Sequence, residues 1–371
     1  MRTVSKVLLN LLRYFLVALI ILFAIATFLG ESYLQTTFLC LLIVAMIWWP
    51  SVIKERWNRT ISITSRLLII MVLGLISFMA FKEPKSSIYL SKEMESELME
   101  IYDTHVAGWP QGTEDIYVDT EFGKVHVLAC GSEANPPLVM IHAASMGAFS
   151  WHENLEPLIE NYRIYSIDNI GEGNKSRLSD VLEFPKTQKE IADHFASIMD
   201  GLGVDSAPVF GASNGGFVAM CYTHFYPERV ASLALFGPMG LTQLSGKSIM
   251  MLSIATMYPL QSIRDRVIRW ALGEDEYVIG KYGEWFNCMM KATIPSVGKP
   301  VPMTTAQKSA MDLPVLLFLG TKDQIVGDVD VAKSQAESYP NIRLEVLESG
   351  HMIAIEHADY VNSVVREFLV Q

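Results

Sequence analysis

Apolar residues dominate the first 81 positions of the chain and form three runs, at residues 7–30, about 33–50 and 67–81. A helix that crosses a bilayer needs roughly 20 such residues. The first run meets that length, while the second and third need their flanks or a thinner bilayer. The pattern predicts that residues 1–81 are a membrane anchor of three transmembrane helices. A signal peptide is the alternative for the first run, although more apolar sequence follows it at once.

Positively charged residues predict the orientation of this anchor in the membrane. The connection between the first two runs has no basic residue, whereas the start of the chain and residues 51–66 are rich in them: Arg2, Lys6, Arg13, Lys54, Arg56, Arg59 and Arg66. The positive-inside rule therefore places the N-terminus and the 51–66 loop in the cytoplasm. Three spans would leave the rest of the chain on the outer face of the cell membrane. Two spans would leave it inside.

Residues 82–111 predict a linker with a short helix at about 91–106. Ser91 is suited to the N-cap because its hydroxyl can accept from a free N–H of the first turn. A capping box would need Glu or Gln three residues later, where the chain has Met94. The box is therefore expected to be absent.

From about residue 115 the pattern alternates between strands and helices. A Phe122-Gly123 turn between two β-type runs predicts a hairpin. The further predicted strands are 138–142, 163–167, 208–211, 232–236, 315–320 and 344–347, and the helices are 150–160, 187–203, 214–226, 329–339 and 356–370. Such alternation predicts a mostly parallel sheet covered on both faces, with ligands at the carboxyl ends of the strands. Residues 238–312 lack a clear strand, which indicates a helical insertion.

Composition and charge narrow the function classes. Half of the 371 residues are hydrophobic and 19% are charged, which excludes a disordered chain and a small disulfide-stapled scaffold. Residues 1–81 hold seven basic and two acidic residues, and the rest holds 22 basic and 38 acidic ones. The net charge is thus +5 in the first part and −16 in the second. Nucleic acid is therefore not an expected partner.

The four cysteines lie far apart, at Cys40, Cys130, Cys221 and Cys288, and no motif has the spacing of metal ligands. We expect no metal and no cofactor. Most of the cysteines are expected to be small buried hydrophobes, although a disulfide among the last three stays open.

The segment Gly211-Ala212-Ser213-Asn214-Gly215 is G-x-S-x-G between a predicted strand and a predicted helix. A serine on such a sharp turn is exposed above the sheet, and only small residues at Gly211 and Gly215 let the chain pass that closely. The backbone N–H of Asn214 would then point at a developing oxyanion. The alternative is a glycine-rich turn without chemistry.

Two further residues favour the chemical interpretation. Asp323 follows the strand at 315–320, and His351 follows the last predicted strand. A serine hydroxyl is a weak nucleophile at neutral pH, so it needs a base, and the base needs a carboxylate to fix its tautomer. Ser213, Asp323 and His351 come in the order of one known hydrolase triad, each at the carboxyl end of a strand.

With these residues the sequence resembles the α/β-hydrolase superfamily of serine esterases and lipases, from about residue 112 to 371. Residues 166–176 are similar to that family's D-x-x-G-x-G-x-S turn, and residues 351–357 are similar to its catalytic-histidine segment. The insertion at about 238–312 matches the place of its helical cap. The resemblance implies a nucleophilic Ser213, a basic His351 and an orienting Asp323.

One segment departs from the family pattern. Where the family usually has His-Gly, this chain has His142-Ala143-Ala144-Ser145. By position, the N–H of Ala144 would be the second oxyanion donor. Ala143 would be strained if the site requires a positive φ. A hydroxyl donor at Ser145 is a further hypothesis. His142 is expected to be structural. Four further histidines are expected either to be structural or to lie at the surface: His152, His194, His224 and His357.

Together these inferences predict an α/β fold with a helical cap behind N-terminal transmembrane helices, acting as a membrane-anchored serine hydrolase. The expected substrate is a small, apolar carboxylic ester, hydrolysed through an acyl-enzyme on Ser213. Thioesterase, acyltransferase and C–C bond hydrolase activities use the same triad and stay open, because the fold does not choose among them. A ligand-binding sensor with slow turnover is the alternative of another class.

Overall fold

The computed structural model describes residues 87–370, apart from 244–247, 249–250 and 252–260. The predicted membrane anchor at residues 1–81 and the first part of the predicted cap therefore lie outside the described residues. Within the described part, no helix is both long enough and apolar enough to cross a bilayer.

The described strands form one nine-stranded sheet in the order β1-β2-β4-β3-β6-β7-β8-β9, with β5 beside β2. Their bounds are β1 (Glu114–Thr120), β2 (Gly123–Cys130), β3 (Pro137–Ile141), β4 (Arg163–Ile167), β5 (Arg177–Leu178), β6 (Ala207–Ala212), β7 (Val230–Phe236), β8 (Val315–Gly320) and β9 (Ile342–Leu347). The β1–β2 pair is the predicted antiparallel hairpin, and β2 is also antiparallel to β4. From β4 to β9 all neighbours are parallel, as the alternating pattern predicted.

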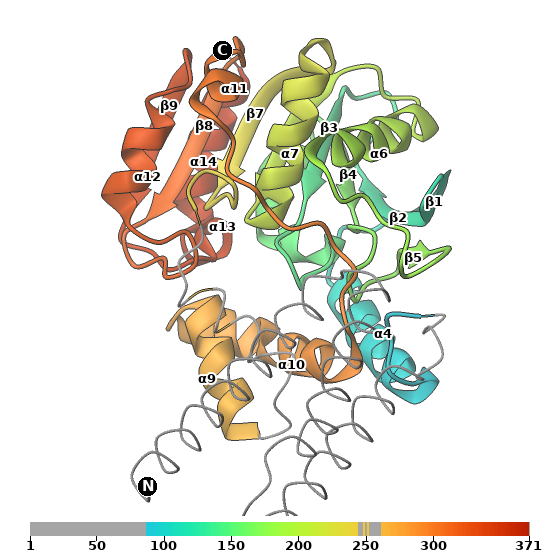
Figure 1. The fold of residues 1–371 in the computed structure, drawn as a ribbon. Coiled ribbons are helices and arrows are strands. Elements are labelled where there is room, and N and C mark those ends of the chain that lie inside the picture. Colours follow the sequence, from blue (N-terminus) through green and yellow to red (C-terminus); the bar gives the residue numbers. More distant parts are fainter. Residues whose placement is uncertain (1–86, 244–247, 249–250, 252–260, 371) are drawn as a thin grey trace, which may run out of the picture. The chain divides into compact units, whose positions relative to one another are not determined.

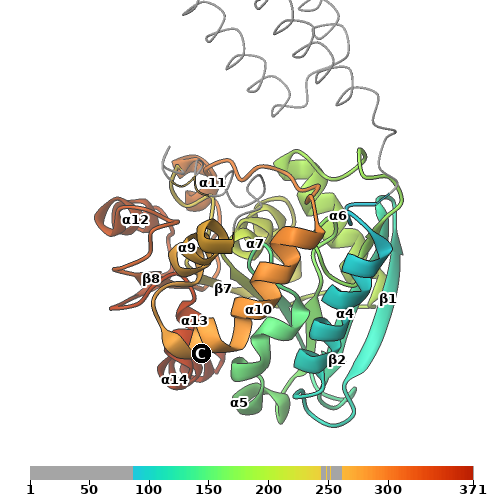
Figure 2. The same cartoon turned by 90° about the horizontal axis from the view of Figure 1, so that it is seen from below.

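Helices connect the strands and cover both faces of the sheet. The helices are α4 (Lys92–Val106), η2 (Ala148–Asn154), α5 (Glu156–Ile159), α6 (Gln188–Gly201), α7 (Asn214–Phe225), η3 (Pro227–Arg229), α9 (Gln261–Leu272), α10 (Glu276–Ala292), α11 (Thr305–Ser309), α12 (Val329–Ala336), α13 (Ile353–Glu356) and α14 (Ala358–Leu369). In Figures 1 and 2, α6, α7 and α12 lie on one side of the sheet, and α5 and α14 lie on the other. Near-continuous apolar strands such as β8, buried at every residue, fit between these two layers.

One predicted helix is interrupted in the structure, and another begins two residues later than predicted. The helix expected at 150–160 is a 3₁₀ helix, η2, followed by the four-residue α5. The helix expected at 356–370 is α14, which begins two residues later because His357, with a φ of −125° and a ψ of 39°, is not helical and separates α14 from the short α13 before it. The apolar spacing continues across the junction of η2 and α5, so hydrophobic periodicity alone predicts one helix there.

Helix α4 begins after Ser91, whose hydroxyl accepts from the N–H of Met94, as the N-cap prediction required. The helix packs against α10 of the insertion and buries Leu98 and Tyr102. Figure 2 shows α4 and α10 side by side, with α9 beyond them. The described part of the insertion contains helices and no strand, in agreement with its predicted character.

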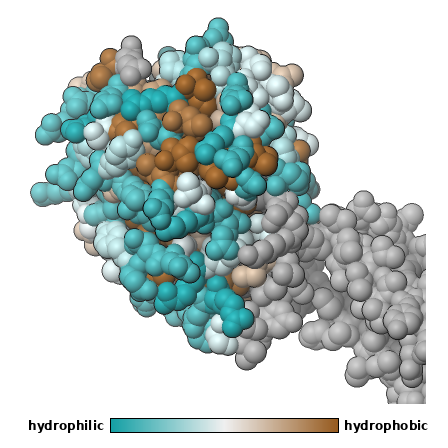
Figure 3. All heavy atoms as spheres, turned by 90° about the vertical axis from the view of Figure 1, so that its left-hand side faces the viewer, coloured by the Kyte–Doolittle hydropathy of each residue, from teal (hydrophilic) through white to brown (hydrophobic). Residues whose placement is uncertain are grey.

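Strand β9 is an edge of the sheet, and all six of its residues are half-buried. Figure 3 views the molecule from the side that carries β9 and α12, and it shows apolar side chains gathered among hydrophilic ones. Val331, an apolar residue of α12, is about half exposed to solvent. This edge is therefore less completely covered than the central strands.

A buried polar network joins α4, the hairpin and the turn after β4. Asp168 is fully buried, and its carboxylate accepts from the Tyr102 hydroxyl at 2.9 Å and the Ala148 N–H at 2.7 Å. The two ring nitrogens of His126 lie 2.8 Å from Asp168 and 2.7 Å from Asp115. Although burial acts to raise the pKa of Asp168, hydrogen bonding and charge from His126 hold it below its ordinary value.

Asp168→Asn is expected to lower the free energy of unfolding by about 2–4 kcal/mol at pH 7, because an amide can accept at only one of the two oxygen positions that bind the Tyr102 hydroxyl and the Ala148 N–H. A carboxylate with a lowered folded-state pKa stabilises the fold above its unfolded pKa of about 3.9, and that contribution is lost as the pH falls further. The free energies of unfolding of the wild type and the variant, measured in urea, should therefore differ by the same amount at pH 7 and pH 5. The two values should converge below about pH 4. A difference that vanishes already at pH 6 would contradict this assignment.

Candidate active site

Ser213 occupies the sharp turn between β6 and α7. Its φ of 49° and ψ of −115° are unusual for a residue with a side chain. The turn is held by the Ser213 N–H, which donates to Phe236 O at 3.0 Å, and by the Ser213 carbonyl, which accepts from Met239 N at 2.9 Å. Neighbouring strand ends thus fix the strained serine at the carboxyl edge of the sheet.

The two glycines of the motif are required by close packing. A Cβ at Gly211 would lie 2.5 Å from the carbonyl oxygen of Gly215, and one at Gly215 would lie 2.3 Å from the carbonyl oxygen of Ile141. These obstacles are backbone atoms, which cannot turn aside as a flexible side chain would. The start of α7 therefore passes between β6 and the end of β3 only without side chains at both positions.

Asp323 and His351 meet at the carboxyl ends of β8 and β9. The Nδ1 atom of His351 lies 2.7 Å from Oδ2 of Asp323. The other carboxylate oxygen accepts from the N–H groups of Ile325 at 2.8 Å and Val326 at 3.0 Å. Burial acts to raise the pKa of Asp323, but the charge and hydrogen bond of His351, with these two N–H groups, hold it below its ordinary value. Asp323 is thus an ionised acceptor for the imidazole.

Ser213 and His351 line the same small cavity. The Nε2 atom of His351 is buried and has no hydrogen-bond partner among the residues that the structure describes. It is the ring nitrogen that a serine–histidine pair uses, since Nδ1 faces Asp323. The structure therefore brings the three sequence-predicted residues to one place, with the His–Asp contact formed.

Glu356, which sequence analysis gave no role, clamps the loop that carries His351. Its carboxylate accepts from the Gly350 N–H at 2.8 Å and the Met352 N–H at 3.2 Å, on either side of the histidine, and from the Ser349 hydroxyl at 2.9 Å. The loop between β9 and α13 is thereby tied to the helix end that follows it.

Glu356→Ala is expected to lower kcat by about 10- to 100-fold, because a displacement of the catalytic base by about 1 Å costs that much in rate. Ester hydrolysis should be measured per active site, counted by end-point labelling with a fluorophosphonate, so that lost folding is not mistaken for lost catalysis. Glu337→Gln, an exposed carboxylate, is the control. An unchanged kcat per labelled site would show that the histidine loop needs no such clamp.

The segment after β3 does not have the positive φ at Ala143 that would have strained this alanine. Among the described residues other than glycine, positive φ occurs at Ser145 (65°) and Ser213 (49°), so the left-handed residue lies two positions later. The Ser145 N–H donates to Oε2 of Glu172 at 2.6 Å, and its carbonyl accepts from the indole of Trp285 on α10 at 2.9 Å. Ala143 therefore does not adopt a left-handed conformation. The left-handed residue is Ser145, which directly follows Ala144.

His142 lies beneath this segment in a structural role, as its sequence position suggested. Its Nε2 accepts from the Asn169 N–H at 2.9 Å, and Nδ1 lies 2.7 Å from the carbonyl oxygen of Ala143. The ring is fully buried. With Nε2 accepting, Nδ1 carries the proton and donates to Ala143, so both nitrogens are engaged with backbone.

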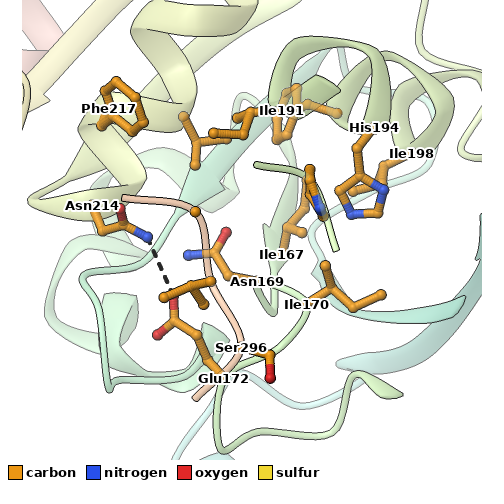
Figure 4. A pocket seen from close by; sticks show the side chains of 15 residues that line it. Ile167, Asn169, Ile170, Glu172, Ile191, His194, Ile198, Asn214, Phe217 and Ser296 are labelled. Carbon is orange, nitrogen blue, oxygen red and sulfur yellow. Dashed lines mark hydrogen bonds between the residues drawn. The ribbon is translucent and has the colours of Figure 1, made fainter. Parts of the chain in front are cut away.

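Glu172 lies in a cavity beside the start of α7, shown in Figure 4. The Asn214 side chain points toward it, and Asn214 Nδ2 is 3.4 Å from Glu172 Oε1. Burial raises the pKa of Glu172 above its ordinary value, against the opposing effects of His142 and the Ser145 N–H. Apolar side chains form most of the remaining wall, which also includes His194; burial lowers the pKa of His194 to about 4.

Sequence reasoning missed three contributors to this site, Glu172, Glu356 and Gly237. An added Cβ at Gly237, where φ is 50°, would lie 3.1 Å from Asp323 Oδ2 and 3.4 Å from His351 Nδ1. The two acids stood inside segments already quoted for the family resemblance, and an acid between two glycines at 171–173 was the available signal.

The described residues contain no group of three or more His, Cys, Asp or Glu side chains arranged to hold a metal ion. Cys130, Cys221 and Cys288 are free and buried, so no disulfide links them.

Comparison with known proteins shows which class of enzymes the chain is similar to. A family model described as alpha/beta hydrolase fold matches residues 136–259. The chain is 28% identical to the "Uncharacterized carboxylesterase nap" of Bacillus subtilis over 72% of this chain and 90% of the relative. It is 26% identical to carboxylesterase YbfK of the same organism, over 72% and 92%. The crystal structure of naproxen esterase (carboxylesterase NP) from Bacillus subtilis superposes with a TM-score of 0.69 at 25% identity, covering 76% of this chain and 99% of that one.

The sheet order, the serine turn and these matches show that the chain has the α/β-hydrolase fold. These relatives are carboxylic ester hydrolases, and the chain is a carboxylesterase-like α/β hydrolase.

Proposed function

We propose that this protein hydrolyses carboxylic esters through an acyl-enzyme on Ser213. The Ser213 Oγ attacks the ester carbonyl carbon while His351 Nε2 takes the hydroxyl proton. His351 returns that proton to the departing alcohol oxygen. A water then attacks the acyl-enzyme while His351 takes a proton from it, and His351 gives this proton to Ser213 Oγ as the acid is released. The 2.7 Å contact between His351 and Asp323, beside the strained Ser213, is the observation that carries the proposal.

The backbone N–H groups of Asn214 and Ala144 are the proposed oxyanion donors. Asn214 is the first residue of α7, where N–H groups have no partner inside the helix and the dipole is positive. Ala144 directly precedes Ser145, whose position is fixed from two sides. Preorganised donors of this kind stabilise the tetrahedral intermediate more than the bound ester.

The insertion favours an apolar acyl or alcohol group on the substrate. Helix α10 buries a row of aromatic and sulfur-containing side chains, Trp285, Phe286, Met289 and Met290. Side chains of these types also line apolar ligand sites in other proteins. We therefore propose a small apolar ester rather than a charged one.

We also propose that the chain is an integral membrane protein with the hydrolase domain on the outer face. The support is the three apolar runs before residue 82 and the basic residues that flank them. The chain should stay with membranes after alkaline carbonate washing. In Ser334→Cys, an exposed position on α12, a membrane-impermeant maleimide should label intact cells. Labelling only after lysis would instead place the domain inside.

The activity itself is tested with p-nitrophenyl esters from acetate to palmitate, using the full chain in detergent. We expect hydrolysis that stops when one equivalent of a fluorophosphonate has reacted, with the chain-length profile measuring the acyl pocket. Labelling without hydrolysis of any ester or thioester would favour an acyltransferase or a slow-turnover sensor. A folded protein that shows neither reaction would exclude a serine hydrolase.

A further inference from the structure

Glu172 contacts both halves of the proposed oxyanion hole. Its Oε2 accepts from the N–H of Ser145 at 2.6 Å, one peptide beyond Ala144. Its Oε1 faces Nδ2 of Asn214 at 3.4 Å, the residue that supplies the other backbone donor (Figure 4). One carboxylate therefore bridges two segments that lie 69 residues apart in the sequence, between positions 145 and 214.

The environment of this carboxylate is unusual for a residue with a purely structural role. Glu172 is 2% exposed, and among the residues that the structure describes none of its hydrogen-bond partners is a lysine or arginine. Its neighbours are neutral donors, together with His142, whose Nε2 accepts a backbone N–H. A buried carboxyl without a cation is costly to the fold, so positions of this kind are often retained for function.

Ser145 shows what the contact holds in place. Its positive φ is a conformation that residues with side chains seldom adopt. The Ser145 N–H donates to Glu172, and the Ser145 carbonyl accepts from the indole N–H of Trp285 on α10 of the insertion. Without Glu172 the peptide plane between Ala144 and Ser145 can turn, which changes ψ of Ala144 and removes a restraint from the adjacent peptide that carries the Ala144 N–H.

We propose that Glu172 is a positioning residue that sets the spacing of the two oxyanion donors, Ala144 N–H and Asn214 N–H. This inference rests on the proposed ester hydrolysis at Ser213. Glu172 does not touch the reacting atoms. It acts through the Ser145 peptide on one side and the Asn214 side chain on the other.

The proposal predicts a loss of kcat rather than of substrate binding. Oxyanion donors act on charge that develops in the transition state, so their displacement leaves KM nearly unchanged. Removal of a whole donor costs roughly 100- to 1,000-fold in kcat. Misplacement in Glu172→Ala is expected to cost about 10- to 100-fold. Glu172→Gln keeps one acceptor oxygen for one of the two donors and should lie between this variant and the wild type.

The test uses the full chain in detergent, with p-nitrophenyl butyrate as substrate and end-point fluorophosphonate labelling to count folded sites. An alkylboronic acid serves as a second probe, because its tetrahedral adduct on Ser213 places an oxygen where the oxyanion forms. In both Glu172 variants the inhibition constant of the boronic acid should rise by the factor by which kcat/KM falls. Glu121→Gln, an exposed carboxylate in the β1–β2 turn, should change neither value.

Three outcomes would overturn the proposal. In Glu172→Ala, a kcat per labelled site within twofold of the wild type would do so, and so would a loss in kcat/KM that lies wholly in KM. If Glu172→Ala yields no folded sites, Glu172→Gln decides, and wild-type kcat with wild-type boronic acid affinity in that variant overturns the proposal. A wild-type chain without Ser213-dependent turnover would instead refute the proposed function itself.

Discussion

Ser213→Ala is expected to abolish ester hydrolysis, with kcat falling by at least about 10⁴-fold. The alanine keeps the backbone of the turn and removes only the Oγ atom that would form the acyl-enzyme. Covalent labelling by a fluorophosphonate should vanish with it, because the reagent bonds to the same oxygen. The measurement is steady-state hydrolysis of a p-nitrophenyl ester together with gel detection of the label.

Ser232→Ala provides a matched control for this change. Ser232 is a buried serine on β7 that does not line the cavity of Ser213 and His351. Its replacement should leave turnover and labelling near the wild-type level. Labelling that persists in Ser213→Ala and disappears in another serine variant would move the nucleophile elsewhere. A Ser213→Ala protein that unfolds at the wild-type temperature excludes a trivial loss of structure.

Most of the sheet could be predicted from sequence because its strands are short, continuous apolar runs. Residues 163–167 and 315–320 were predicted with the bounds that β4 and β8 have in the structure. The interruption between η2 and α5 could not be predicted in the same way. The apolar spacing continues through residue 155, while packing against the sheet decides where the backbone turns.

The triad could be predicted because each member follows a strand and the order along the chain is informative. Glu172 and Glu356 could not, since their shortest contacts are to backbone N–H groups, at Ser145 for one and at Gly350 for the other. No side-chain pattern encodes such partners. The positive φ lies at Ser145 rather than at Ala143 for a related reason, because the turn is set by long-range contacts to Ser145.

Asp323→Asn is expected to lower kcat by about 10⁴-fold while the fold is kept. The structure gives a specific reason. The Oδ1 atom accepts from the N–H groups of Ile325 and Val326, so the amide of an asparagine must place its oxygen there. Its NH₂ group then takes the position of Oδ2, opposite Nδ1 of His351.

That orientation imposes the wrong tautomer on the histidine. An NH₂ group donates to Nδ1, which leaves the ring proton on Nε2, and a protonated Nε2 cannot accept the proton of Ser213. Hydrolysis of a p-nitrophenyl ester and the rate of fluorophosphonate labelling should therefore fall together, since both need the same proton transfer. Asp312→Asn, an exposed aspartate before β8, should leave both rates unchanged. A loss of less than tenfold in Asp323→Asn would mean that another group orients His351, because the two backbone donors leave the amide no other arrangement.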